Sequence, residues 1–249
     1  MTDVIVAEGR SLVKKYGDKT VVNGIHFQIK KGECFGFLGP NGAGKTSTMK
    51  MMYGASPVSG GELHVLGLDV MKNGKAIKRR IGVVPQEDGL DPDFNVFENL
   101  QMYGRYFGMK TKDIQDRARE LLRFMRIDEK STASVSELSG GMKRRVNLAI
   151  GVIHNPAILI LDEPTVGVDV QTRHAIINYL MELNKNGTTL IYTSHQLSEA
   201  EGLCEQVALI DVGRIITQDS LANLLKEHQQ ESLEDLFLNL TGKEYRNDI

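Results

Sequence analysis

Short apolar runs alternate with amphipathic segments along most of the chain after residue 30. The runs are four to six residues long, which is the length of a strand, and the segments between them repeat apolar positions at helical spacing. This alternation predicts an α/β fold with a mainly parallel sheet and crossover helices. The expected strands are residues 33–38, 81–84, 157–161, 188–193 and 206–211.

Two other parts of the chain follow different patterns. Residues 4–6, 21–22 and 61–66 are brief stretches that predict short antiparallel strands of an N-terminal β subdomain. Between about 95 and 136 the strand signal is absent, and Asn95 followed by Glu98 is a helix-start signature. Two series at helical spacing follow, namely Val96, Leu100, Tyr103 and Phe107, then Ile114, Ala118, Leu121 and Met125. They predict an inserted helical lobe, in which the apolar residues form either a core or an interaction surface.

One segment carries a complete phosphate-binding loop, G-x-x-x-x-G-K-[ST]. Its glycines let the backbone turn its N–H groups toward phosphate oxygens, while the lysine reaches the outer phosphates and the threonine ligates Mg²⁺. The expected strand 33–38 precedes the loop, and a helix from Thr46 to Tyr53 follows it, so phosphate would lie at a helix N-terminus. The loop predicts a nucleoside triphosphate site at Gly39, Pro40, Asn41, Gly42, Ala43, Gly44, Lys45 and Thr46, with Ser47 next.

The composition excludes several other classes. The chain of 249 residues has a formal net charge of −2, so no overall basic field indicates nucleic acid. No stretch approaches the roughly 18 apolar residues of a membrane span, and the N-terminus lacks the apolar core of a secretory signal. Cys34 and Cys204 form no C-x-x-C motif, and Cys34 is interpreted as a small buried hydrophobe. A reduced, cytosolic protein is expected.

Two acidic residues follow the apolar run 157–161. Asp162 at the strand end is placed to hold Mg²⁺, and Glu163 to orient a water toward the γ-phosphate. Taken alone, the pair leaves an ordinary acidic turn before Pro164 open as the less favoured alternative. Upstream, Leu138-Ser139-Gly140-Gly141 begins a helix and forms a second anion-ready N-terminus. One nucleotide does not need both phosphate sites unless they belong to different subunits.

Together these motifs resemble the nucleotide-binding subunit of ABC-type ATPases, in the family's order and over essentially the whole chain. Ser139, Gly140 and Gly141 match the family signature, which is more specific than the phosphate loop. Further matches are Gln86 to the loop glutamine, Asp169 to the aspartate loop, His195 to the switch histidine and Tyr16 to the aromatic that stacks on adenine. The resemblance implies ATP as nucleotide, catalytic roles for Glu163, His195 and Gln86, and Mg²⁺ held by Thr46, Gln86 and Asp162.

The resemblance also implies a domain organisation around a P-loop NTPase (RecA-like) core. The ATP-binding domain would cover 1–218, with the β subdomain at about 1–30 and 60–75. The core would take about 31–59, 76–86 and 142–218, and the helical lobe about 87–141. A C-terminal tail at 219–249 would carry helices near 220–228 and 232–240.

Family members work as head-to-tail dimers, so an ATP-bound homodimer is expected, with Ser139 and Gly141 of one subunit capping the γ-phosphate on the other. The chain resembles in particular the type-2 exporters for drugs, antibiotics and lipo-oligosaccharides. This implies a separately encoded membrane permease and a location on the cytoplasmic face of the cell membrane. A soluble ATPase that drives macromolecular assembly is the alternative, and a kinase would leave the signature unexplained.

A basic trio follows the signature: Lys143, Arg144 and Arg145. The sequence leaves three interpretations open, which are contact with phosphate, contact with anionic lipid headgroups, and a solvated helix face.

Overall fold

The computed structural model describes residues 4–87 and 89–242. They divide into two compact units. The first unit takes the described residues up to Lys78 and those from Leu183 onward, and the second takes Arg79–Glu182. We describe each unit separately.

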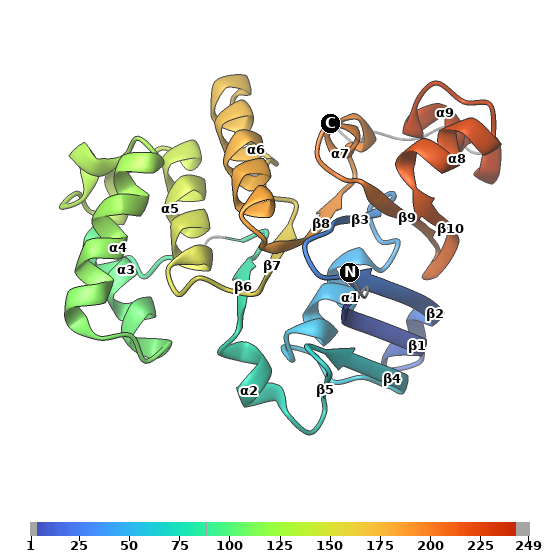
Figure 1. Ribbon diagram of the computed structural model, residues 1–249, viewed down its shortest axis with the longest axis horizontal. Helices are drawn as coiled ribbons and strands as arrows, with labels where there is room; N and C mark the ends of the chain where they lie inside the picture. Colours follow the sequence, from blue (N-terminus) through green and yellow to red (C-terminus); the bar gives the residue numbers. More distant parts are fainter. Residues whose placement is uncertain (1–3, 88, 243–249) are drawn as a thin grey trace. The chain divides into compact units, whose positions relative to one another are not determined.

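An antiparallel sheet opens the first unit, in the order β2-β1-β4-β5. Its strands are β1 (Ile5–Tyr16), β2 (Lys19–Lys30), β4 (Gly60–Val65) and β5 (Leu68–Asp69), and β1, β2 and β4 lie side by side in Figure 1. The expected antiparallel strands are therefore present, but β1 and β2 are far longer than their short apolar stretches predicted. In β2, buried apolar residues alternate with exposed polar ones, since only one face of this sheet is covered.

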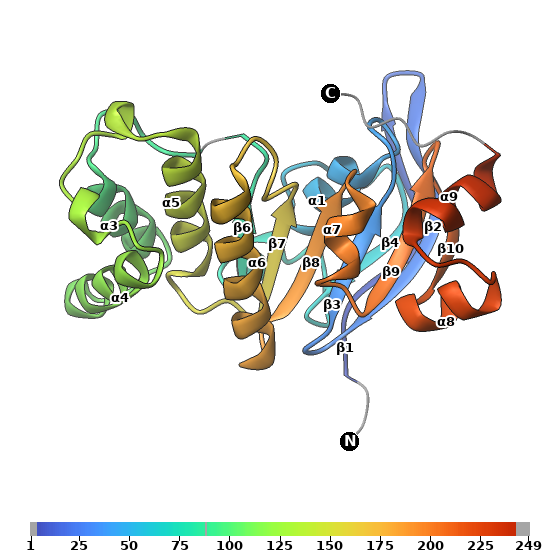
Figure 2. The same cartoon turned by 90° about the horizontal axis from the view of Figure 1, so that it is seen from above.

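A second set of strands in this unit has the order β10-β9-β3-β8. β3 (Cys34–Leu38) pairs in parallel with β8 (Thr189–Ser194) and β9 (Gln206–Asp211), while β10 (Arg214–Ser220) is antiparallel to β9. All residues of β3 and β8 are buried, and Figure 2 shows β3 beside β8 and β9. The hydrophobic pattern of the sequence did not predict β10, because most of the side chains in this strand are polar and partly or fully exposed.

The two cysteines are brought together in this unit. Cys34 lies in β3 and Cys204 just before β9, and their Sγ atoms are 3.8 Å apart although the residues are distant in the chain. Both side chains are buried, as expected for Cys34. The hydrogen bond with Cys204 and burial raise the pKa of the Cys34 thiol well above its ordinary value. A thiol held neutral in this way is a poor nucleophile, which agrees with a packing role.

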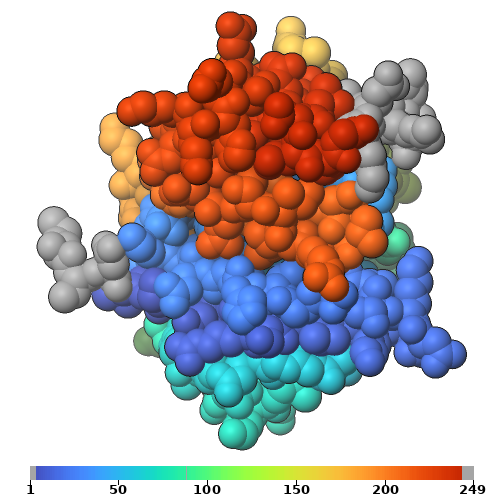
Figure 3. Space-filling model, turned by 90° about the vertical axis from the view of Figure 1, so that its right-hand side faces the viewer, coloured from blue at the N-terminus to red at the C-terminus, as the bar shows by residue number. Residues whose placement is uncertain are grey.

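Five helices complete the first unit. They are α1 (Lys45–Met52), α2 (Gly74–Lys78), α7 (Leu197–Glu201), α8 (Leu221–Glu227) and α9 (Leu233–Thr241). Ser220 caps α8 and Ser232 caps α9, each by accepting a backbone N–H of the first turn, and both tail helices were predicted. The C-terminal elements lie over the N-terminal strands in Figure 3, and Asn23 N donates to Gly213 O at 2.8 Å between them.

The tail helix α9 is an integral part of this unit, and its packing can be tested. Leu236 is fully buried, whereas Leu238 on the same helix is 37% exposed. We expect Leu236→Ala to lower the free energy of unfolding by about 2–5 kcal/mol, and Leu238→Ala by less than about 1 kcal/mol. Chemical denaturation of both variants measures the difference. Equal losses would show that α9 is not packed by this face.

The second unit contains two parallel strands and a group of helices. β6 (Ile81–Val84) pairs with β7 (Ile158–Asp162), and Val84 lies opposite Leu161. The helices are α3 (Val96–Tyr106), α4 (Thr111–Phe124), α5 (Gly140–Val152) and α6 (Val170–Lys185), with short 3₁₀ helices at Asp128–Lys130 and Val135–Glu137. The end of α6, from Leu183 onward, belongs to the first unit. All five strands expected for the α/β part are found, in the two units together, to within one residue at each end.

The predicted helical segment is present in this unit. Asn95 and Glu98 form the expected capping box, in which each side chain accepts the other's backbone N–H at 2.9 Å. α3, α4 and α5 contact one another and lie together in Figure 2. The second apolar series is buried in full; in the first, Val96 and Leu100 are buried, and Tyr103 and Phe107 are half-buried. Most of these residues therefore form core.

Across residues 4–87 and 89–242, no helix is both long and apolar enough to span a membrane.

Candidate functional site

The phosphate loop connects β3 to α1 in the first unit. Ala43 N donates to Pro40 O at 3.2 Å, which closes the loop, and Gly44 caps α1 with a left-handed backbone (φ 106°). Lys45 is 3% exposed, and its ammonium donates to Gly39 O at 2.7 Å and Pro40 O at 3.1 Å. The lysine charge is therefore held at the loop itself.

Only glycine fits at position 39 without a movement of the backbone. Its φ is 150°, and an added Cβ would lie 2.0 Å from the carbonyl oxygen of Ile210. Gly17, in the turn between β1 and β2, has φ 57° but no atom within 4 Å of the same added carbon.

We expect Gly39→Ala to lower the free energy of unfolding by about 3 kcal/mol or more, because the backbone must move as well as adopt a strained φ. Gly17→Ala carries only the cost of its positive φ, about 1 kcal/mol. Thermal and denaturant unfolding of the two variants gives the comparison. A Gly39→Ala variant as stable as Gly17→Ala would contradict the close approach.

Tyr16 ends β1 and lies beside the phosphate-loop helix. Its ring is about half exposed, and the Lys14 ammonium lies 4.6 Å from the ring centroid. Its hydroxyl is 3.4 Å from Ser56 Oγ, and hydrogen bonds with Ser56 and then Ser47 lower the pKa of the phenol below its ordinary value. An exposed ring next to Ser47 is available for stacking on a base.

His195 follows β8, whose end lies beside the start of the phosphate loop. Leu38 and Ser194 are paired in register, and Gly39 N donates to Ser194 O at 3.4 Å. Ser194 Oγ accepts Gln196 N at 2.8 Å and so fixes the turn that holds the half-buried His195. The structure thus brings the histidine segment and the phosphate loop to the same end of neighbouring strands.

The acidic pair lies in the second unit, at the end of β7. Asp162 is 6% and Glu163 5% exposed, and Glu163 has a left-handed backbone with φ 49°. Gln86, just beyond β6, donates from Nε2 to Glu163 Oε2 at 3.3 Å. The structure therefore brings two predicted catalytic residues into direct contact, and both carboxylates of the acidic pair are buried rather than solvated.

Arg144 is a residue whose place the sequence patterns did not predict. It lies in α5, is 5% exposed, and donates to the backbone carbonyls of Pro85, Gln86, Asp162, Glu163 and Pro164. Arg145 donates to the carbonyls of Met125, Arg126 and Gly141. A solvated helix face is therefore wrong for Arg144. The one available indication in the sequence was that Arg144 precedes Leu148, an apolar residue that is buried, by one helical turn.

The signature residues begin α5. Ser139 caps the helix by accepting Met142 N at 3.3 Å, and both Ser139 and Gly140 are exposed. A Cβ added to Gly141 would lie 3.3 Å from Thr172 Oγ1 and 3.6 Å from Asp169 Oδ2. Asp169 accepts both the hydroxyl and the backbone N–H of Thr172, which lower the pKa of its carboxyl. The signature and the aspartate loop of one chain are thus in contact.

The candidate Mg²⁺ ligands are hard oxygen donors. Asp162 ends β7 and Gln86 comes two residues after the paired strand β6, so both lie at the same end of these two strands, while Thr46 is in the first turn of α1 in the other unit. The described part of the chain has no group of three or more His, Cys, Asp and Glu side chains arranged to hold a metal. A hydroxyl, an amide and one carboxylate fit Mg²⁺, which takes few protein ligands alongside phosphates and water.

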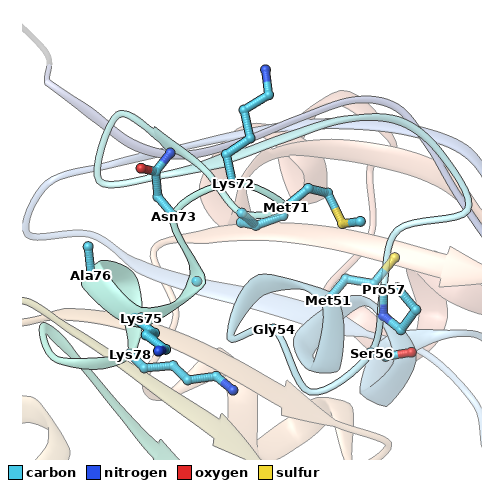
Figure 4. A pocket seen from close by; sticks show the side chains of 12 residues that line it. Met51, Gly54, Ser56, Pro57, Met71, Lys72, Asn73, Lys75, Ala76 and Lys78 are labelled. Carbon is cyan, nitrogen blue, oxygen red and sulfur yellow. The ribbon is translucent and has the colours of Figure 1, made fainter.

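A cavity of about 680 Å³ also opens in the first unit (Figure 4). It lies between the end of α1 and the segment that leads into α2, and the figure shows Lys72 and Asn73 pointing away from Met51. Its lining contains none of the predicted site residues; it consists of Met51, Gly54, Ser56, Pro57, Val70, Met71, Lys72, Asn73, Gly74, Lys75, Ala76 and Lys78.

Comparison with known proteins gives consistent matches. Residues 22–166 match the family model described as ABC transporter. Nod factor export ATP-binding protein I of Ralstonia nicotianae is 46% identical over 217 residues, which cover 87% of this chain and 67% of the relative. A solved ATP-binding subunit of an ABC transporter matches with a TM-score of 0.87 and 25% identity, covering 95% of this chain and 99% of that one.

A further solved structure is the dimeric post-hydrolysis state of an ATP-binding cassette bound to ADP and Pi. It matches with a TM-score of 0.80 and 24% identity, and covers 86% of this chain and 98% of that one.

These matches confirm the predicted fold class, with its mainly parallel sheet and N-terminal antiparallel sheet. They also confirm the prediction of an ATP-binding subunit of an ABC transporter. Since more than half of the chain matches the family model and a relative is 46% identical, the chain belongs to the ABC transporter family as an ATP-binding subunit.

Proposed function

We propose that Glu163 is the general base of ATP hydrolysis and that Gln86 reports the state of the γ-phosphate to it. The observation that carries this proposal is the 3.3 Å hydrogen bond between the two side chains, at the ends of paired strands. A buried carboxylate orients and polarises a water, and a positioned general base contributes about 10²–10⁴-fold to a rate. His195, beside the start of the phosphate loop, is the second sensor of the γ-phosphate.

ATP would be bound by the loop 39–46 with Ser47. Lys45 would exchange its bonds to the carbonyls of Gly39 and Pro40 for the outer phosphates, a charge-assisted contact that exists only with nucleotide present. Tyr16 would stack on the base, as its exposed ring supports. Mg²⁺, held by Thr46, Gln86 and Asp162, supplies charge neutralisation on the phosphates when bound. Gln86 donates to Glu163 through Nε2, so its amide oxygen would be the atom available to the ion.

The working form would be an ATP-bound homodimer, arranged head to tail. Ser139, Gly140 and Gly141 are exposed or half-buried at the N-terminus of α5, a position suited to an anion. Although Ser139 Oγ accepts a backbone N–H, its own O–H is free by valence to donate to a γ-phosphate of the other subunit. Asp169 lies beside Gly141 and would couple the aspartate loop to this contact between the signature and the γ-phosphate. Loss of the γ-phosphate would then open the dimer.

We further infer that the dimer drives a separately encoded membrane permease on the cytoplasmic face of the membrane, for export. The relative of Ralstonia nicotianae is an export ATP-binding protein by name, which favours transport over a soluble assembly ATPase. The segment 87–141, proposed as the helical lobe, leads from Gln86 to the signature and is the surface proposed to carry the nucleotide state outward. With a net charge of −2, no nucleic-acid partner is expected.

An affinity pull-down tests the transport role. Tagged Glu163→Gln protein is incubated with detergent-solubilised membranes and Mg-ATP, and retained proteins are identified by mass spectrometry, with Lys45→Ala as the matched control. The proposal expects a polytopic membrane protein retained by the first variant and reduced with the control. Retention of soluble proteins only, in repeated preparations, would instead support an assembly ATPase.

A further inference from the structure

One buried guanidinium, that of Arg144, connects the two segments that carry Gln86 and Glu163. Nε donates to Pro164 O at 2.7 Å, and Nη2 donates to Asp162 O at 3.1 Å and Glu163 O at 2.8 Å. Nη1 donates to Pro85 O at 2.5 Å and Gln86 O at 3.3 Å. A guanidinium has five N–H donors in a planar fork, and each corresponds to one of these five carbonyls.

The backbone around Glu163 explains why one side chain can reach three successive carbonyls. In an extended strand, successive carbonyls alternate in direction, so they do not converge on one point. Glu163 instead has φ 49°, a conformation that is unusual for a residue other than glycine. The hydrogen bonds from Arg144 to these three carbonyls compensate the strained conformation of Glu163. That conformation in turn orients the carboxylate that Gln86 contacts.

We propose that Arg144 is a positioning residue for hydrolysis, which holds the Gln86 segment and the left-handed Glu163 in one fixed geometry. The proposal rests on the roles given to Glu163 and Gln86 above. Because the same helix begins with the signature, Arg144 also ties that helix to the acidic pair within one subunit. With its donors directed to backbone carbonyls, the side chain is not oriented to bind phosphate or lipid headgroups.

Lysine is the most informative replacement. Arg144→Lys keeps the positive charge, but a single ammonium has three donors and no fork, so it cannot bridge both segments. A misplacement of about 1 Å at a catalytic group can cost about 10²-fold in rate. We therefore expect kcat for Mg-ATP to fall by about that factor, with KM and the ATP dissociation constant within about threefold of wild type. Arg144→Gln is the second variant, with the same expectation.

Two readouts distinguish the proposed positioning role of Arg144 from a purely structural role. Leu122→Ala removes a buried side chain of α4 in the same unit and lies outside both segments, so it is expected to lower stability alone. Its kcat per folded molecule should match wild type. In addition, Arg144→Lys should accumulate an ATP-bound dimer in size-exclusion chromatography, because binding precedes the impaired step.

The outcomes separate this proposal from the proposed function. Turnover of both Arg144 variants within threefold of wild type would overturn it, as would an equal loss in a Leu122→Ala variant of matched melting temperature. If Glu163→Gln itself hydrolyses ATP normally in the same assay, the assignment of the base fails instead, and with it the geometry that Arg144 is proposed to hold.

Discussion

Replacing Glu163 by glutamine should lower kcat for ATP hydrolysis by about 10³-fold and leave ATP binding nearly unchanged. Glutamine has the shape of glutamate and still accepts a hydrogen bond, so the end of β7 and the Gln86 contact are retained. It cannot take a proton from water. ATP would bind, the dimer would close, and the step that opens it would be absent.

Three measurements on one preparation check this result. Phosphate release gives kcat, fluorescent-nucleotide titration gives the dissociation constant, and size-exclusion chromatography with Mg-ATP gives the dimer fraction, which should rise. Glu129→Gln is the matched control, because Glu129 is an exposed residue of the 3₁₀ helix Asp128–Lys130. Turnover near that of wild type would remove Glu163 from the role of general base.

The second large effect is expected on binding. Lys45→Ala should weaken the affinity for ATP by about 10²–10³-fold, since a buried charge that pairs with phosphates is typically worth several kcal/mol to a complex. The same ammonium bonds two carbonyls of the loop, so its removal should also lower the free energy of unfolding by about 1–3 kcal/mol without nucleotide.

Isothermal titration of ATP into the variant, with a melting curve of the same sample, separates the two effects. Lys78→Ala serves as control, because Lys78 is an exposed lysine of the same unit and lies outside the phosphate loop. Adenosine, which has no phosphates, should bind Lys45→Ala and wild type equally weakly. An unchanged affinity for ATP would contradict the assignment of the loop.

These expectations depend on sequence and tertiary structure to different degrees. Motifs confined to neighbouring residues were predictable, because their conformation follows from local geometry. The capping box at Asn95 and Glu98, the strands that lead into the phosphate loop and the acidic pair, and the tail helices are of this kind. The long strands β1 and β2 were underestimated, since a third of the residues of β1 and half of those of β2 are exposed, and the exposed positions carry little apolar signal.

Other features arise only when distant segments meet. β10 is stabilised by pairing with β9 rather than by its own composition, and the contact between Cys34 and Cys204 joins residues 170 positions apart. The same holds for Arg144. Because Arg144 belongs to a basic trio after the signature, the sequence allowed contact with phosphate, contact with lipid headgroups, or exposure to solvent. The fold instead buries Arg144 against five backbone carbonyls from two segments.

The sequence by itself determined the order of the motifs that identifies the family, and from them it predicted which side chains bind phosphate, ligate Mg²⁺ and activate water. The tertiary structure decided how those groups are held, including the Gln86–Glu163 hydrogen bond, the left-handed Glu163 and the clamp by Arg144. The physical reason is that chemical capacity belongs to individual side chains. Orientation, by contrast, depends on backbone carbonyls and burial, which the amino-acid pattern does not display until the chain is folded.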